Sequence, residues 1–200
     1  MAMIKYPTGQ GSKKNLKEES STNFGRRGMS LEKMINLSNK HYLNLGIAVV
    51  HKKPTPIQIV KVDYPNRSHA RITEAFFRQP STTDYNGVYK GYYLDFEAKE
   101  TTRATYLPLD NFHEHQIHHM EQCLKQKGIC FVIVSFVKLN RFFMLNASQV
   151  IKYWNLQTKN GRKSIPVEIF ETHGYEFKPS SLPLIPYIDY VDAIIAKESK

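Results

Sequence analysis

The sequence has few of the features that mark a secreted or membrane-bound protein. It holds only two cysteines among 200 residues, Cys123 and Cys130, and neither lies in a CxxC or another spacing typical of metal ligands. We expect two buried thiols in a reducing compartment. The longest apolar run, residues 129–137, is too short to cross a membrane and predicts a buried strand. No apolar signal-type segment is visible near the N-terminus, so we expect a soluble cytoplasmic protein without membrane contact.

Acidic residues are also scarce relative to basic ones. The chain has 18 Asp and Glu against 28 Lys and Arg, a formal net charge of +10. Such an excess favours a polyanionic partner, above all nucleic acid, although ribosomal and membrane-surface proteins share it. Hydrophobic residues make up 41% of the chain, which suffices for one domain with a core.

The chain divides into a polar arm and a folded part. Residues 1–28 are basic and rich in Gly and Ser, which predicts a flexible arm that either lies on phosphates or is merely solvated. Residues 29–200 have α/β patterning. Helices are expected at 30–45, 111–127 and 148–158, strands at 47–50, 91–101, 129–137 and 141–145, and a strand or short helix at 187–195.

Between the first two expected strands lies a segment with hairpin patterning. Residues 57–62 and 70–77 both alternate between apolar and polar, and residues 65–68 (PNRS) predict a turn between them. Few of the apolar positions fit a strand that is buried on both faces. We therefore expect an insertion at about 51–80 that projects from the body.

Residues 93–99 carry the pattern of most chemical interest. Alternate side chains of a strand share a face, so Leu94, Phe96 and Ala98 are expected to face the core. The other face then carries Tyr93, Asp95, Glu97 and Lys99, and a turn-rich segment upstream supplies Asp84.

Two carboxylates and a lysine suit the hydrolysis of a phosphodiester. Mg²⁺ prefers oxygen ligands and lowers the pKa of a bound water, and a lysine can stabilise the charge that develops. The spacing alone leaves open a solvated strand face with an incidental Glu–Lys pair. It also does not choose between Asp95 and Glu97 as the metal ligand.

The expected helix at 111–127 adds Gln116, which falls in its apolar sector. A buried amide needs a partner, either a catalytic carboxylate or water nearby or the backbone. The histidine-rich run 113–119 places His115 and His119 four residues apart, but they fall outside the apolar sector of the helix and have no third ligand or HExxH motif. We therefore expect these histidines on a surface that faces solvent or phosphate.

Several strings closely resemble the RecU family of Holliday junction resolvases, from about Asn23 to the C-terminal region. They are residues 51–60 (HKKPTPIQIV), 81–89 (STTDYNGVY), 95–101 (DFEAKET) and 111–113 (NFH), with His115 and Gln116. The wider PD-(D/E)xK superfamily has a proline where Thr83 stands, but the RecU strings share this departure. Consecutive matching strings are far more specific than an Asp, a Glu and a Lys at this spacing.

The resemblance implies a restriction-endonuclease-like fold, with a mixed central sheet flanked by helices and a protruding hairpin stalk at 51–80. It implies a homodimer that resolves four-way DNA junctions by paired symmetric nicks in recombination and repair, and contact with a RecA-type recombinase. The family's Mg²⁺ site, which Mn²⁺ could also fill, matches Thr82, Asp84, Glu97 and Gln116. Its transition-state stabiliser matches Lys99.

Basic residues of the arm and the stalk are the candidates for DNA binding, namely Arg26, Arg27, Lys52, Lys53, Lys61, Arg67 and Arg71. The alternative for each is a solubilising surface charge. For the whole chain, the rival functions are a non-catalytic junction-binding or strand-annealing protein, a sequence-specific restriction enzyme and a basic ribosome-associated protein.

Overall fold

A computed structural model describes residues 29–66, 69–78, 82–157, 159, 161–179 and 181–198 of the chain. The expected arm at 1–28, with Arg26 and Arg27, lies outside these residues, as does Arg67. Within the described part, no helix is both long and apolar enough to span a membrane.

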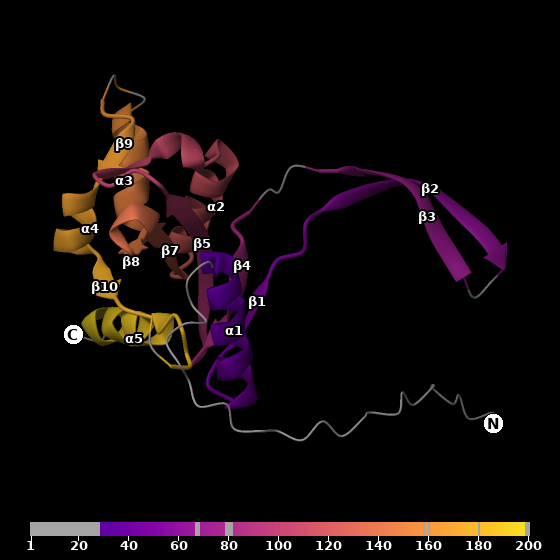
Figure 1. The fold of residues 1–200 in the computed structure, drawn as a ribbon, viewed down its shortest axis with the longest axis horizontal. Coiled ribbons are helices and arrows are strands. Elements are labelled where there is room, and N and C mark those ends of the chain that lie inside the picture. Colours follow the sequence, from indigo (N-terminus) through magenta and orange to yellow (C-terminus); the bar gives the residue numbers. More distant parts are fainter. Residues whose placement is uncertain are drawn as a thin grey trace.

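A mixed six-stranded sheet forms the centre of the protein (Figure 1). Its order is β1-β4-β5-β7-β8-β10; β5 and β7 run parallel and every other neighbouring pair is antiparallel. The strands are β1 (Val49–Lys52), β4 (Tyr85–Tyr89), β5 (Tyr92–Thr101), β7 (Ile129–Phe136), β8 (Arg141–Asn146) and β10 (Tyr175–Phe177). Two short strands, β6 (Tyr106–Pro108) and β9 (Ser164–Pro166), pair separately.

Helices cover both faces of this sheet. On one face lie α1 (Leu31–Asn44) and α5 (Tyr187–Glu198); on the other lie α2 (Glu114–Lys125), α3 (Ala147–Gln157) and α4 (Val167–His173). Because side chains alternate along a strand, Phe131 and Ile133 of β7 face the first layer, whereas Val132 and Val134 face the second. The fold is therefore the mixed sheet flanked by helices that we expected.

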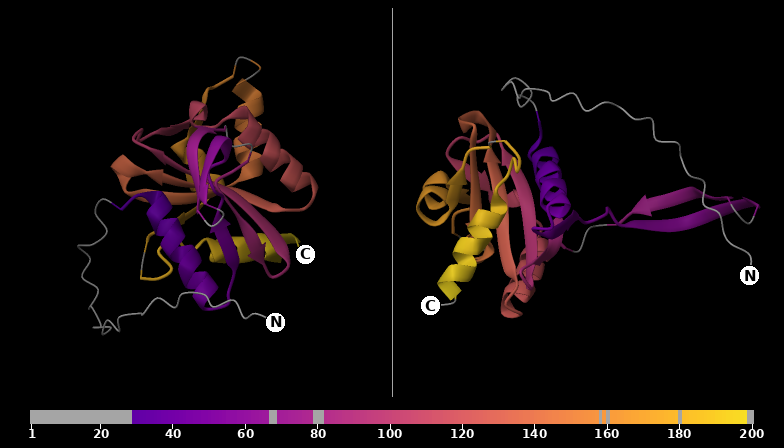
Figure 2. Two further views of the ribbon diagram at one scale, coloured as in Figure 1. Left: turned by 90° about the vertical axis from the view of Figure 1, so that its right-hand side faces the viewer. Right: turned by 90° about the horizontal axis from the view of Figure 1, so that it is seen from below.

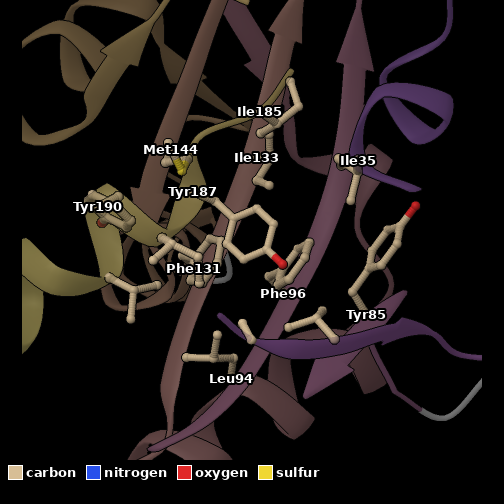
Figure 3. Packing of buried hydrophobic residues seen from close by; sticks show 14 of the residues in the cluster. Ile35, Tyr85, Leu94, Phe96, Phe131, Ile133, Met144, Ile185, Tyr187 and Tyr190 are labelled. Atoms are coloured by element: carbon tan, nitrogen blue, oxygen red, sulfur yellow. The ribbon is translucent and has the colours of Figure 1, made fainter. Parts of the chain in front are cut away.

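Aromatic residues fill the core between the sheet and the first helical layer (Figure 3). The Phe96 ring stacks between Tyr85 and Phe131, with centroid distances of 4.9 and 4.8 Å, and Tyr187 of α5 packs against it at 5.2 Å. Each of these four side chains is fully buried. This packing fixes β4, β5 and β7 to one another and so sets the positions of the side chains on the opposite face of these strands.

Strands β2 (Ile57–Asn66) and β3 (His69–Phe77) form a separate two-stranded antiparallel ribbon. Figures 1 and 2 show this ribbon lying away from the sheet. Every residue of β3 is exposed, including Phe77 at 84%. The prediction of a β-hairpin is confirmed; that the ribbon serves as the family's stalk stays a prediction.

Sequence patterning located most elements but not all. The first helix begins after Ser30, whose hydroxyl accepts a bond from the Lys33 amide, and the chain turns at Gly46 with φ +65°. The C-terminal segment is a helix, the second of the two expected alternatives. Strand β4 was missed because its Asn86-Gly87 pair favours a turn, and Gly87 is needed there: a Cβ would lie 2.1 Å from the Val49 carbonyl oxygen.

Candidate active site

Strand β5 carries the candidate site on the face that α2 covers. Phe96 and Leu94 face the core as expected, and Asp95 and Glu97 face the other way. That other face is not solvated: Asp95 is 0% exposed and Glu97 is 1% exposed. The alternative of a solvated strand face is therefore wrong, and two buried acids need partners.

Glu97 is the centre of the first group of contacts. Its Oε1 lies 2.7 Å from the Lys99 ammonium and accepts a bond from the Gln116 amide at 2.8 Å. Its Oε2 accepts from the backbone N–H of Asp84 at 3.0 Å. The Asp84 carboxylate in turn accepts from the backbone N–H of Ala98 at 3.4 Å. Two acids and a lysine from separate segments thus converge.

The electrostatics of Glu97 suit a cation. Burial is the main cause that raises the pKa of Glu97 to about 7; Lys99 lowers it in part and Asp84 raises it further. A divalent ion would restore the charged form. The donor set fits Mg²⁺, because two carboxylates meet and Asp84 is only half-buried, which leaves an approach from the surface.

Gln116 finds partners of both kinds that the sequence left open, the Glu97 carboxylate and a backbone group. Its side-chain oxygen accepts from the backbone N–H of His113 in a capping box at the start of α2, so its amide N–H is turned to Glu97. Gln116 therefore orients Glu97. For Gln116 to offer its oxygen to a metal, the amide would have to turn over.

Thr82 and Lys99 complete the predicted set. The Thr82 hydroxyl donates to the carbonyl oxygen of Thr83 at 3.4 Å, just before Asp84; its role at a metal stays a prediction. The Lys99 ammonium lies 5.3 Å from the centre of the Phe112 ring, a cation–π contact that holds it beside Glu97.

A second group of contacts surrounds Asp95, and sequence reasoning missed it. The Asp95 carboxylate accepts from Lys53 at 2.8 Å, from Tyr93 at 2.8 Å and from the Thr83 hydroxyl, and it lies 3.1 Å from His119. Burial pushes the pKa of Asp95 up, but the bonds from Lys53 and Thr83 outweigh burial, so the net shift is downward. Asp95 is an ionised anchor, distinct in role from Glu97.

The structure corrects the expectation for the histidines. His119 faces Asp95 instead of the surface, with its side chain 20% exposed, whereas the side chain of His118 is 65% exposed as expected. The step of about 100° between consecutive residues of α2 accounts for the difference. His119 also approaches Cys123 at 3.5 Å, so Asp95, His119 and Cys123 have the spacing of metal ligands that the sequence did not reveal. Both cysteines are free thiols; Cys130 is buried as expected, whereas Cys123 is half-buried.

The candidate DNA-binding residues differ in their surroundings. Lys61 and Arg71 are exposed on the β2–β3 ribbon. Lys52 pairs with Glu32 at 2.7 Å on the surface. Lys53 points inward, with its side chain 18% exposed and its ammonium on Asp95. The phosphate role of these residues stays a prediction, and for Lys53 the contacts indicate another use.

Comparison with known proteins agrees with this picture. The family model described as "Recombination protein U" (RecU) matches residues 26–193. A protein of Lactiplantibacillus plantarum is 57% identical over 202 residues, with 98% of each chain covered, and bears the name "Holliday junction resolvase RecU". A protein of Pediococcus pentosaceus with the same name is 54% identical over 194 residues, covering 95% of this chain and 96% of its own.

Proposed function

The chain belongs to the RecU family, and from this premise we propose that it is a metal-dependent endonuclease that resolves four-way DNA junctions. The observation that carries the proposal is the pair of contacts that Glu97 makes, with Lys99 at 2.7 Å and with the backbone N–H of Asp84 at 3.0 Å. A protein that only held DNA would have no need to bury Glu97 beside a lysine and a second, half-buried acid.

The side chains divide the work as follows. Asp84 and Glu97 would hold Mg²⁺, and Mn²⁺ would suit the same oxygen donors. When bound, the ion would lower the pKa of a water and offset charge on the scissile phosphate. Lys99 would orient the attacking water and stabilise the charge on the phosphate. Gln116 keeps Glu97 aimed, and Thr82 would support the metal from the segment before Asp84.

DNA binding would rest on the basic residues of the arm and the ribbon. Among the described residues, Lys61 and Arg71 lie on the β2–β3 ribbon, which as a stalk would enter the centre of the junction. Two copies related by a two-fold axis would place two sites on opposing strands, so we propose a homodimer that makes paired symmetric nicks. Such work in recombination and repair would take place in the cytoplasm, beside a RecA-type recombinase.

One experiment separates this function from its rivals. Synthetic four-way junctions and matched linear duplexes are incubated with the protein in Mg²⁺ or in EDTA. We expect paired nicks in the junction only, and only with Mg²⁺. Equal cutting of the linear duplex would indicate a restriction enzyme, and binding without cutting would indicate a non-catalytic junction-binding protein.

The variant Asp84→Asn adds the control for mechanism. Cleavage should be lost while junction binding persists, because affinity comes from phosphate contacts remote from the acids. Loss of binding in Asp84→Asn would mean that the acid is structural.

A further inference from the structure

Lys53 joins the base of the β2–β3 ribbon to the segment that carries Asp84. It follows the last residue of β1, and its backbone N–H donates to the Asp84 carbonyl oxygen at 2.7 Å. Its ammonium donates to the Thr83 hydroxyl at 3.0 Å and to Asp95 at 2.8 Å. Lys53 therefore binds the Thr83-Asp84 pair through both its main chain and its side chain.

Asp95 holds the other end of these side-chain contacts in place. It lies on β5 two residues before Glu97, and its carboxylate also binds Thr83, Tyr93 and His119. Thr83 is 2% exposed, so Asp84 follows directly from a residue that is held from both sides. Besides the bond from its own N–H to Glu97, the Asp84 backbone is thus placed by contacts from Lys53 and, through Thr83, from Asp95.

We propose that Lys53 and Asp95 form a positioning pair that sets the Asp84 carboxylate at its working distance from Glu97 and ties that geometry to the base of the ribbon. This inference rests on the proposed function. The pair acts through Asp84 and touches neither DNA nor metal, so we call its members positioning residues.

Two other uses of the cluster fit the contacts less well. A phosphate contact by Lys53 would require its ammonium to leave Asp95, which would then be buried without its main partner. A metal held by Asp95, His119 and Cys123 would compete with the same ammonium, which already lies 2.8 Å from the carboxylate as the compensating cation.

The test measures how strongly Mg²⁺ is held. The variants are Lys53→Met, Asp95→Asn and the double variant, which removes both charges and so avoids a single buried charge that could prevent folding. We expect the Mg²⁺ concentration for half-maximal junction cleavage to rise about tenfold to a hundredfold in each, as for other supports of metal ligands. Junction affinity in EDTA should match that of the wild type.

A second readout needs neither DNA nor cleavage. The rise in Tm with added Mg²⁺ reports binding to the folded protein, and the variants should need proportionally more Mg²⁺ for the same rise. Controls are Lys90→Met and Asp192→Asn, which break a surface ion pair of 2.8 Å on β4–β5 and α5 and should leave both readouts unchanged.

The outcomes separate cleanly. If the double variant showed the Mg²⁺ dependence of the wild type, the proposed positioning role would be wrong. It would also be wrong if junction binding in EDTA weakened while the Mg²⁺ requirement stayed unchanged. That second result would make Lys53 a phosphate contact. Stoichiometric zinc in the purified protein, lost in Asp95→Asn, would replace the pair by a metal site. A wild-type protein that leaves junctions uncut would contradict the proposed function, while the Tm measurement would still decide on the pair.

Discussion

Replacing Glu97 by glutamine should stabilise the metal-free protein while it destroys activity. Glu97 is 1% exposed, and burial is the main reason that its pKa rises from 4.5 to about 7. The amide stands in for the neutral carboxyl group. Glu97→Gln therefore removes the unfavourable burial of a charge. Its oxygen can accept from Lys99 and Gln116 and its amide N–H can donate to the Asp84 carboxylate, although the Asp84 backbone N–H loses its acceptor.

The size of the expected stabilisation and its pH range follow from the pKa shift of Glu97. A pKa of about 7 instead of 4.5 corresponds to about 3 kcal/mol of lost stability once the folded carboxyl group is ionised. Because the folded pKa is the higher one, this stability is fully present below pH 4.5 and is lost as pH rises through 7. The variant should thus match the wild type near pH 4.5 and exceed it by about 3 kcal/mol at pH 8, or roughly 5–10 °C in Tm.

The assay is thermal unfolding of both proteins in EDTA at pH 4.5 and pH 8, followed by Mg²⁺ titration at pH 8. Mg²⁺ should raise the Tm of the wild type and leave that of Glu97→Gln nearly unchanged, because the variant lacks one of the two carboxylates. The control is Glu176→Gln, which removes an exposed carboxylate from its pair with Arg141 and should not stabilise the protein at pH 8. A Glu97→Gln protein that melts below the wild type at pH 8 in EDTA would refute the reasoning, since the buried charge would then contribute net stability.

Other substitutions test the remaining parts of the site. Lys99→Met should lower the cleavage rate about a hundredfold to a thousandfold without weakening junction binding, as single-turnover assays beside gel shifts would reveal; a rate near wild type would exclude the lysine from catalysis. Gln116→Ala removes the 2.8 Å bond to Glu97 and should lower activity or Mg²⁺ affinity about tenfold or more in an Mg²⁺ titration, whereas an unchanged titration would make the contact incidental. Arg71→Gln on the ribbon should reduce the slope of log affinity against log salt by about one, and an unchanged slope would mean that Arg71 meets no phosphate.

The local parts of the fold could be predicted because their causes lie close together in the sequence. Ser30 and Gly46 bound the first helix through bonds within a few residues, and the alternation of Leu94 and Phe96 with Asp95 and Glu97 gave the two faces of β5. The resemblance to the RecU family then chose Glu97 over Asp95. The structure agrees with a physical difference between the acids: Asp95 is saturated by neighbours, whereas Glu97 carries the raised pKa.

Long-range contacts had no such local cause. Strand β4 escaped prediction because Asn86-Gly87 favours a turn by local rules, and only pairing with β1 and β5 on both sides makes it a strand. His119 was expected on the surface because its angle on the helix was judged against apolar neighbours, although the side chain that it meets is an acid on another strand.

The sequence by itself determined that this protein has a strand with acids on one side and a core on the other, and a basic character suited to DNA. Only the tertiary structure decided that Asp84 meets Glu97, and that Lys53 reaches Asp95 across 42 residues. The physical reason is that the packing of strands and helices sets which partner lies beside a buried charge. That packing is a property of the whole chain.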